Sequence, residues 1–381
     1  MKQLSIETFY VLQGICVSVL VVGCALQGIS APAPTLKAAY EKDFLIGVAI
    51  NQSQFSREDR RGVPIIQAQF NSITPENVLK WESVHPEPDR YAFDAPDRYV
   101  QFGETNGMFI IGHTLVWHSQ TPKWVFQDAN GKPLDRDGLL NRMSNHIHTV
   151  VGRYQGRIKG WDVVNEALNE DGSLRQSPWL KIIGEDYIAK AFQYAHDADP
   201  AAQLHYNDFS LENEPKRNGA VALIKKLQAQ GIPVTAVGLQ GHDKMEWPTV
   251  EQEDATITAF AKLGVKVMIT ELDVDVDLAN QTNRSADIGA TVSSAGSGGY
   301  TNGLPDSVQR ALAKRYADLF GVFLKHRDVV TRVTFWGVTD GDSWLNSYPR
   351  RRVNHPLLFD RQGKAKPALE AVIQAASPPL P

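Results

Sequence analysis

The feature that most constrains this chain is a series of eight short apolar segments between residues 44 and 340. Each is a near-continuous apolar run, as expected for a strand buried on both faces of a sheet. The segments are FLIGVAI (44–50), FNSITPEN (70–77), FIIGHTLVW (109–117), IKGWDVVNEA (158–167), QLHYNDF (203–209), VTAVGLQGH (234–242), VKVMITELDV (265–274) and VTRVTFWGVTD (330–340).

Helical patterns separate these segments. The predicted helices cover residues 139–151, 187–198, 218–230, 256–263 and 308–325. Eight strands with helices between them predict the α/β class and the (β/α)8 TIM barrel. An open doubly wound sheet is the structural rival, but it would need a glycine-rich phosphate loop after an early strand. The chain contains no G-x-G-x-x-G or Walker A pattern.

One barrel accounts for most of the chain. We predict a single catalytic domain over residues 40–376, followed by a C-terminal tail over 377–381. A length of 381 residues allows two domains at ~150 residues each, but α/β barrels exceed that size as single units. Apolar residues make up 43% of the chain, so it can bury a large core without disulfides or metals. We expect a monomer.

The charge balance argues against a polyanionic partner. The formal net charge is −4, from 39 basic and 43 acidic residues, and there is no basic stripe of the kind that binds nucleic acid. The longest basic cluster, Arg350 to Arg352, is interpreted as part of a solvated loop. A neutral substrate fits this balance better.

The N-terminal segment has the pattern of an export signal. Val11–Leu26 is an apolar run that follows Lys2 and precedes small residues. It has 16 residues, fewer than the ~20 that a membrane-spanning helix needs. We therefore predict a signal peptide over residues 1–31, a short tether over 32–39, and a secreted or cell-surface protein without a transmembrane span.

The fate of this leader has three alternatives. Val21-Val22-Gly23-Cys24 resembles a bacterial lipobox, in which the cysteine becomes the lipidated first residue of the mature chain. The second alternative is ordinary cleavage near Ala31, and the third is a retained anchor. The other cysteine, Cys16, also lies in the leader, so removal of the leader leaves a body without disulfides.

Chemistry in a barrel of this kind gathers at the carboxyl ends of the strands. These positions are unusually polar and aromatic here. They carry Glu76, Asn77, Lys80, His113, Trp117, Gln120, Asn165, Glu166, Tyr206, Gln240, His242, Glu271, Asp273, Trp336 and Trp344.

Two glutamates in this set stand out. Glu166 and Glu271 end the fourth and seventh strands, three steps apart around an eight-membered ring, so their side chains can face each other. Facing carboxylates are what glycoside hydrolysis requires. One must donate a proton and needs a raised pKa, while the other must stay ionised and attack the anomeric carbon.

Residues around both glutamates resemble a known family. Trp161 to Ala167 (WDVVNEA) is similar to the acid/base motif of glycoside hydrolase family 10, and Ile269 to Val274 (ITELDV) is similar to its nucleophile motif. The similarity extends over roughly residues 40–375. It includes ITPENVLKW (73–81), GHTLVWHSQTP (112–122), GLQGH (238–242), WGVTDGDSW (336–344) and PLLFDRQGKAKPAL (356–369).

The resemblance implies a retaining endo-β-1,4-xylanase (EC 3.2.1.8) that acts on xylan and xylo-oligosaccharides. It makes Glu166 the general acid/base and Glu271 the nucleophile. Asn165 would hold the 2-hydroxyl of the sugar at the cleavage site. His242 would hydrogen-bond Glu271 and be oriented by Asp273, a pairing that favours an ionised nucleophile.

The remaining residues are assigned to substrate binding by the same resemblance. The pocket around the sugar before the scissile bond would be built by His113, Trp117, Trp336 and Trp344. The next sugar would be bound by Glu76, Asn77, Lys80 and Gln120. Gln240 lies in a matching motif, and Tyr206 would tune either glutamate. The chain departs from the family at Phe209, where a second tyrosine is frequent, and we expect a local packing change there.

Two other functions remain open from the sequence. One is a retaining hydrolase of β-1,4-glucan or mixed aryl glycosides on the same barrel, and the other is a non-catalytic glycan-binding lipoprotein. No HExxH or paired-cysteine pattern is present, so neither a metal nor a cofactor is predicted. The Gly/Ser-rich segment 280–307 follows the seventh strand and is either a flexible surface loop or a mobile wall of the cleft.

Overall fold

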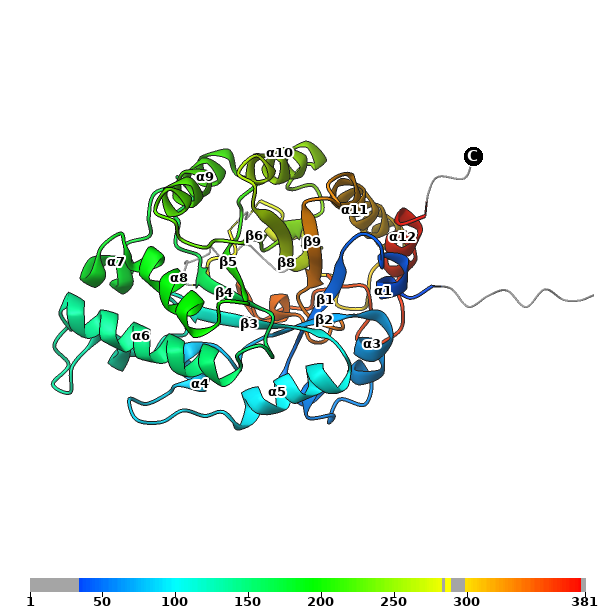
Figure 1. The fold of residues 1–381 in the computed structure, drawn as a ribbon. Helices are drawn as coiled ribbons and strands as arrows, with labels where there is room; N and C mark the ends of the chain where they lie inside the picture. The colour runs from blue at the N-terminus through cyan, green and yellow to red at the C-terminus, as the bar shows by residue number, and fades with distance from the viewer. Residues whose placement is uncertain (1–33, 283–284, 289–298, 378–381) are drawn as a thin grey trace, which may run out of the picture. The chain divides into compact units, whose positions relative to one another are not determined.

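The structure, a computed structural model, describes residues 34–282, 285–288 and 299–377. Eight parallel strands form a ring in the order β6-β5-β4-β3-β2-β1-β9-β8, and pairing of β8 with β6 closes it (Figure 1). This confirms the predicted TIM barrel. The strands are β1 (Leu45–Ile50), β2 (Ser72–Pro75), β3 (Phe109–Val116), β4 (Gly160–Asn165), β5 (Gln203–Asp208), β6 (Ala236–Leu239), β7 (His242–Lys244), β8 (Lys266–Asp275) and β9 (Val330–Phe335).

Helices surround the strands (Figure 1). They are α1 (Leu36–Ala39), α2 (Gln52–Phe55), α3 (Gly62–Gln69), α4 (Trp81–Val84), α5 (Asp94–Thr105), α6 (Arg136–Arg153), α7 (Pro178–Ile183), α8 (Tyr187–Ala198), α9 (Glu214–Ala229), α10 (Val250–Ala261), α11 (Asp306–Lys325) and α12 (Pro367–Ala375). Three short 3₁₀ turns complete the set: η1 (Lys123–Phe126), η2 (Leu278–Asn280) and η3 (Trp344–Asn346).

The strands are buried on both faces, as their apolar sequences predict. All six residues of β4 are buried, and so are nine of the ten residues of β8. Because every ladder in the ring is parallel, the strands reach the same rim with their carboxyl ends. Asn165 at the end of β4 stands beside Asn207 on β5, which brings the polar ends of neighbouring strands together.

The sixth apolar segment differs from its prediction as one strand. It divides into β6, which belongs to the ring, and β7, which pairs only with the end of β8. Gly241 between them has φ +73°, a conformation that residues with a Cβ rarely adopt. The resulting turn places His242 in register with Asp273.

Several helices begin earlier than their apolar pattern predicts, because a polar cap or a proline in the first turn favours the start of a helix. α10 begins at Val250, six residues ahead of its predicted start, and Thr249 caps it with a capping box to Gln252. Asp135 caps α6 by accepting a hydrogen bond from the backbone of Gly138. α9 begins at Glu214, where a proline occupies the first turn.

The folded unit also starts before residue 40. Residues 36–39, expected as part of a tether, form α1, and Leu36 is fully buried. Tyr40 then donates a hydrogen bond from its hydroxyl to the carbonyl of Val372 in α12. The apolar side chain at position 36 is what brings this segment onto the barrel. The predicted signal peptide over 1–31 and nearly all of the predicted tail over 377–381 lie outside the described residues.

Within the part of the chain that the structure describes, no helix combines the length and the apolar character needed to cross a membrane.

Candidate active site

A cleft with a cavity volume of about 170 Å³ lies at the carboxyl rim of the barrel. It brings together the residues predicted from the sequence, except Tyr206 and Asp273. Its lining consists of Glu76, Asn77, Lys80, His113, Trp117, Gln120, Asn165, Glu166, Gln240, His242, Glu271, Ala286, Ile288, Trp336 and Trp344.

Glu166 follows β4 and has an unusual backbone. Its φ is +56°, in the left-handed region that non-glycine residues seldom occupy and that is typical of strained functional positions. The conformation is held from both sides. The Glu166 amide donates to the carbonyl of Asn207 at 2.9 Å, and Nε of Arg175 donates to the Glu166 carbonyl at 3.1 Å.

The Glu166 carboxyl group is buried but well hydrogen-bonded. Nε1 of Trp117 donates to Oε2 at 2.8 Å, and Nε2 of Gln240 donates to Oε1 at 3.0 Å. Burial raises the pKa of Glu166 to about 7, although these two donors oppose the rise and the nearby Glu271 adds to it. A carboxyl group with this pKa can both give and take a proton near neutral pH.

Glu271 lies on β8 and has a different environment. Nδ2 of Asn207 donates to its Oε1 at 2.8 Å, and Nε2 of His242 lies 3.2 Å from its Oε2. On the other side of the imidazole, Nδ1 of His242 lies 3.2 Å from Oδ1 of Asp273. Burial alone would lower the pKa of His242, but Asp273 and Glu271 raise it to about 10. At neutral pH the imidazolium therefore places a positive charge 3.2 Å from Oε2 of Glu271.

Two amides connect the glutamates. Nδ2 of Asn207 donates to Oδ1 of Asn165 at 2.9 Å as well as to Glu271, and Nδ2 of Asn165 donates to Oε1 of Glu166 at 3.2 Å. Since both amides are buried, these bonds fix the relative placement of the two carboxyl groups.

Aromatic and histidine side chains form the wall beside Glu271. Trp344 donates from Nε1 to Oδ2 of Asp273 at 2.8 Å, and its ring lies 4.8 Å from that of His242. Trp336 makes edge contacts with His242 and with His113, at 6.5 and 5.4 Å between ring centroids. These indoles offer the flat apolar surfaces against which the apolar faces of sugar rings pack.

His113 is fixed from behind by Asp162, which sequence reasoning did not single out. Nδ1 of His113 lies 2.9 Å from Oδ2 of Asp162, and Nδ1 of His205 lies 3.2 Å from Oδ1. Burial would raise the pKa of Asp162, but the hydrogen bonds from His113 and His205 hold it well below its usual range. The carboxylate thus leaves Nε2 of His113 for a ligand.

Lys80 connects two other residues of the cleft. Its Nζ donates to Oδ1 of Asn77 at 2.9 Å and to Oε1 of Gln120 at 2.8 Å. Burial lowers the pKa of Lys80, while the surrounding carboxylates, Glu271 and Glu76 foremost, oppose that change. Gln120 has φ +44°, so a second residue of this cleft occupies the left-handed region.

Tyr206 corrects the site prediction. Its side chain is fully buried, and its hydroxyl donates to Oδ2 of Asp208 at 2.5 Å rather than to either glutamate. Successive residues of a strand point to opposite sides, so the adjacent Asn207 faces Glu271 instead. Phe209, the departure from the family, packs under the ammonium of Lys216, whose Nζ lies 3.4 Å from the ring centroid.

The segment 285–288 contributes to the wall of the cleft, and no sequence motif identified these residues as part of the site. Ala286 and Ile288 line the cleft, and Oδ2 of Asp287 accepts a hydrogen bond from Nη1 of Arg175 at 2.7 Å. Tyr348 donates its hydroxyl to the carbonyl of Asp287 at 2.9 Å. Ala286 and Ile288 therefore form part of the cleft wall. Arg175 thereby connects this wall with the backbone of Glu166.

Among the residues that the structure describes, no group of three or more His, Cys, Asp or Glu side chains is arranged to hold a metal ion. The lining of the cleft contains three carboxyl groups, those of Glu76, Glu166 and Glu271, with amides, indoles, two imidazoles and one ammonium around them.

Comparison with known proteins identifies the family. The sequence pattern of glycosyl hydrolase family 10 matches residues 35–375. Endo-1,4-beta-xylanase A of Xylanibacter ruminicola is 44% identical over 343 residues, which cover 90% of this chain and 93% of that protein. Beta-1,4-xylanase of Dictyoglomus thermophilum is 39% identical over 344 residues, covering 90% and 91%. A GH10 endoxylanase structure from a sugarcane soil metagenome superposes with a TM-score of 0.86 at 44% identity, covering 89% of this chain and 99% of the other. This chain is therefore a member of glycosyl hydrolase family 10.

Proposed function

We propose that this protein is a retaining endo-β-1,4-xylanase that cleaves internal bonds of xylan by double displacement. The observation that carries the proposal is the contrast between the two cleft glutamates. Glu166 has a pKa of about 7, whereas Glu271 lies 3.2 Å from a histidine that is protonated at neutral pH. One carboxyl group is thus suited to proton transfer and the other to nucleophilic attack.

In the first step, a carboxylate oxygen of Glu271 attacks the anomeric carbon and forms a covalent glycosyl ester. The bond to the leaving oxygen breaks, and Glu166 transfers its proton to that oxygen, so the leaving chain departs as a neutral alcohol. Trp117 and Gln240 then stabilise the carboxylate that Glu166 becomes. Retention implies a carboxyl separation of ~5–5.5 Å.

In the second step, the ionised Glu166 removes a proton from water as the water oxygen attacks the same carbon. The ester bond to Glu271 breaks, and its carboxylate is restored beside His242. We assign the 2-hydroxyl of the reacting sugar to Asn165, which Asn207 holds in place. That hydrogen bond contributes to the rate to the extent that it strengthens in the transition state.

The substrate preference follows from the wall at Trp344. Xylose lacks the hydroxymethyl arm of glucose, and a bulky indole fixed to Asp273 beside the reacting sugar leaves little room for that arm. The next sugar would be bound by Glu76, Asn77, Lys80 and Gln120. The two relatives compared above are named as xylanases, which agrees with this preference.

We test the stereochemistry and the substrate together. Proton NMR during hydrolysis of xylopentaose should reveal the β-anomer first, because double displacement retains configuration. Reducing ends should appear faster from xylan than from carboxymethyl cellulose. An initial α-anomer would contradict the mechanism, and equal or faster hydrolysis of the cellulose derivative would contradict the xylan assignment.

We also propose that the protein is exported as a monomer with the barrel as its one catalytic domain. Its signal covers residues 1–31 if cleavage is ordinary, or ends before Cys24 if that residue is lipidated. The apolar run 11–26 and the Val21-Val22-Gly23-Cys24 sequence support export, either freely secreted or lipidated at Cys24. Mass spectrometry of the mature N-terminus decides between the two. Recovery of the full-length, unmodified N-terminus from the producing cells would contradict both.

A further inference from the structure

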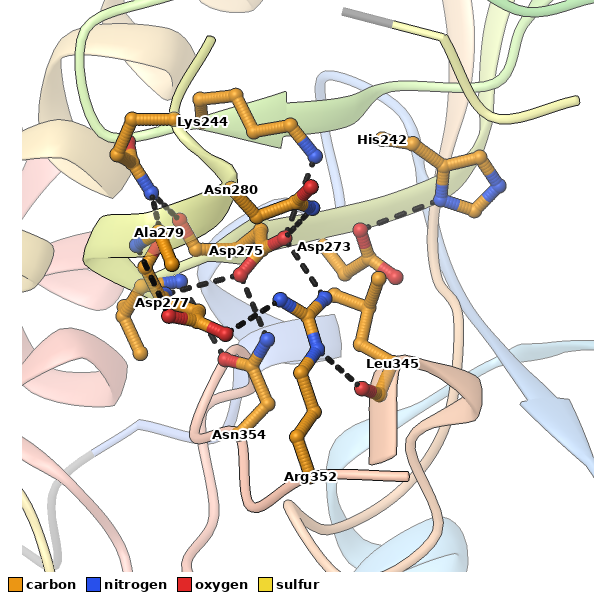
Figure 2. Close-up of polar contacts among 12 residues, drawn as sticks. His242, Lys244, Asp273, Asp275, Asp277, Ala279, Asn280, Leu345, Arg352 and Asn354 are labelled. Carbon is orange, nitrogen blue, oxygen red and sulfur yellow. Dashed lines mark hydrogen bonds and ion pairs between the residues drawn. The ribbon is translucent and has the colours of Figure 1, made fainter. Parts of the chain in front are cut away.

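Behind the nucleophile side of the cleft, the end of β8 carries a buried polar cluster that the proposed mechanism does not use (Figure 2). We call it the Arg352 cluster. Its members are Lys244, Asp275, Asp277, Asn280, Arg352 and Asn354. Both aspartates are fully buried, and the Arg352 side chain is only 2% exposed. The interpretation of Arg350 to Arg352 as a solvated loop is therefore wrong for Arg352.

Arg352 joins three separate chain positions. Its Nη2 donates to Oδ2 of Asp275 at 2.8 Å, its Nη1 to Oδ2 of Asp277 at 2.8 Å, and its Nε to the carbonyl of Leu345 at 2.8 Å (Figure 2). The first two positions are the end of β8 and the start of η2, and the third lies in η3. Only a guanidinium can satisfy this set, because its donors form a planar fork.

The rest of the cluster completes the hydrogen bonding of Asp275. Nδ2 of Asn280 donates to Oδ2 and Nδ2 of Asn354 donates to Oδ1, both at 2.6 Å, and Nζ of Lys244 lies 3.4 Å from Oδ2. Two cations thus face two carboxylates. Such a network costs desolvation, so its retention suits a role in fixing geometry better than a role in net stability.

The cluster leads directly to the cleft. Leu345, which Arg352 holds by its carbonyl, follows Trp344 in η3. The indole of Trp344 lines the cleft and donates to Asp273, which lies two residues before Asp275 on β8. The position of this indole relative to the nucleophile strand therefore depends in part on its own bond to Asp273 and in part on η3, which Arg352 holds at the Leu345 carbonyl. Asn346 gives η3 a further attachment by donating to the carbonyl of Asp340 at 2.8 Å, and the ring of Tyr348 stacks on the indole at 4.6 Å.

We propose that Arg352 is a positioning residue that docks η3 onto the end of β8 and thereby sets the preference of the cleft for sugars without a hydroxymethyl arm. The inference rests on the proposed function, because it concerns the substrate of the same site. Trp344 can exclude the arm only while η3 is held against β8. If the Arg352 bridge is weakened, the indole gains freedom to move aside, and discrimination between xylosides and glucosides falls.

The test compares Arg352→Lys with Arg351→Lys, the same change at the exposed neighbouring position. The readout is the ratio of kcat/KM for 4-nitrophenyl β-xylobioside to that for 4-nitrophenyl β-cellobioside. Lysine keeps the charge but cannot bond both aspartates and the Leu345 carbonyl. We expect the ratio to fall about tenfold in Arg352→Lys, since one excluded substituent is worth about that much discrimination. In Arg351→Lys the ratio should stay at the wild-type value.

A double-mutant cycle separates positioning from general loosening. Trp344→Ala alone should lower the ratio, and Arg352→Lys added to it should lower the ratio no further. Asp277→Asn weakens one of the hydrogen bonds that the Arg352 guanidinium makes and should therefore also lower the ratio. If Arg352→Lys does not fold, the ratio measured for Asp277→Asn tests the inference in its place. An unchanged ratio in the folded variants, or independent multiplicative effects in the cycle, would overturn the inference.

The failure of this inference is distinguishable from failure of the proposed function. A wild-type enzyme that does not cleave the xylobioside contradicts the function. A crystal structure of Arg352→Lys then still tests the bridge, because we expect η3 to be displaced and the Trp344–Asp273 hydrogen bond to be lengthened or lost. An η3 turn in its original place, with that bond intact, would overturn the positioning role.

Discussion

Replacement of Trp117 by phenylalanine should move the alkaline limb of the pH profile upward. The substitution keeps an aromatic ring in the cleft but removes the indole N–H that donates to Oε2 of Glu166 at 2.8 Å. That bond favours the carboxylate, so its loss favours the protonated form and raises the pKa of Glu166 above its present value of about 7.

The size of the shift follows from the charge on the acceptor. A hydrogen bond to a charged group is worth about 1.5–3 kcal/mol, and one pKa unit corresponds to about 1.4 kcal/mol. Glu166 is 5% exposed, so solvent screens little of this difference, and Gln240 remains as the other donor. We expect a rise of at least about one unit, to a pKa of about 8.

The assay is the pH dependence of kcat/KM with phenyl β-xylobioside, whose poor leaving group needs the acid. The alkaline limb then reports the pKa of Glu166 in the free enzyme. With a dinitrophenyl leaving group, kcat/KM should fall little at alkaline pH, because the departure of this group needs no acid. Trp336→Phe is the matched control, since Trp336 contacts His113 and His242 and should leave the limb in place. An alkaline limb that stays fixed or moves downward in Trp117→Phe would refute the reasoning.

Three further predictions use the same site. Glu166→Gln removes a carboxyl group whose pKa rises from 4.5 unfolded to about 7 folded, so wild-type stability is fully present below pH 4.5 and declines up to pH 7. Denaturation experiments should therefore show that the free energy of unfolding of Glu166→Gln, relative to that of the wild type, rises by about 3 kcal/mol between pH 4 and pH 8. A difference in unfolding free energy that does not change with pH would contradict this. Glu166→Ala should nearly stop xylan hydrolysis but spare the first step with dinitrophenyl xylobioside, a result that stopped-flow release of dinitrophenol checks. His242→Asn should cost most stability near pH 6 and progressively less toward pH 10, because the raised pKa of His242 stabilises the fold only while the imidazole is protonated. A constant cost in denaturation experiments over that range would rule this out.

Much of the site could be predicted from the sequence because its residues end buried strands. Glu166 and Glu271 follow apolar runs, and the parallel ring brings such positions to one rim whatever the loops do. The same argument placed Trp336, Gln240 and His113 in the cleft. These predictions depend on strand order and polarity alone.

The parts that were missed depend on information that a pattern does not hold. Tyr206 and Asn207 are adjacent polar residues, and only the pleat of β5 decides which one faces Glu271. Arg352 appears solvated within a basic run, and its burial depends on Asp275 and Asp277, more than 70 positions away. The left-handed backbone of Glu166 is likewise held by contacts with Asn207 and Arg175, which lie on other parts of the chain and are not visible in the local pattern.

The central claim is that Glu271 forms a covalent bond to the sugar. Dinitrophenyl 2-deoxy-2-fluoro-β-xylobioside tests it most directly, because fluorine slows both steps while the activated leaving group keeps the first one fast, so the intermediate accumulates. Peptide mass spectrometry of the inactivated enzyme should find one fluoroxylobiosyl group on Glu271 and none in the Glu271→Ala variant. A label on Glu166 or another residue, or hydrolysis of the probe without any labelled peptide, would contradict the account.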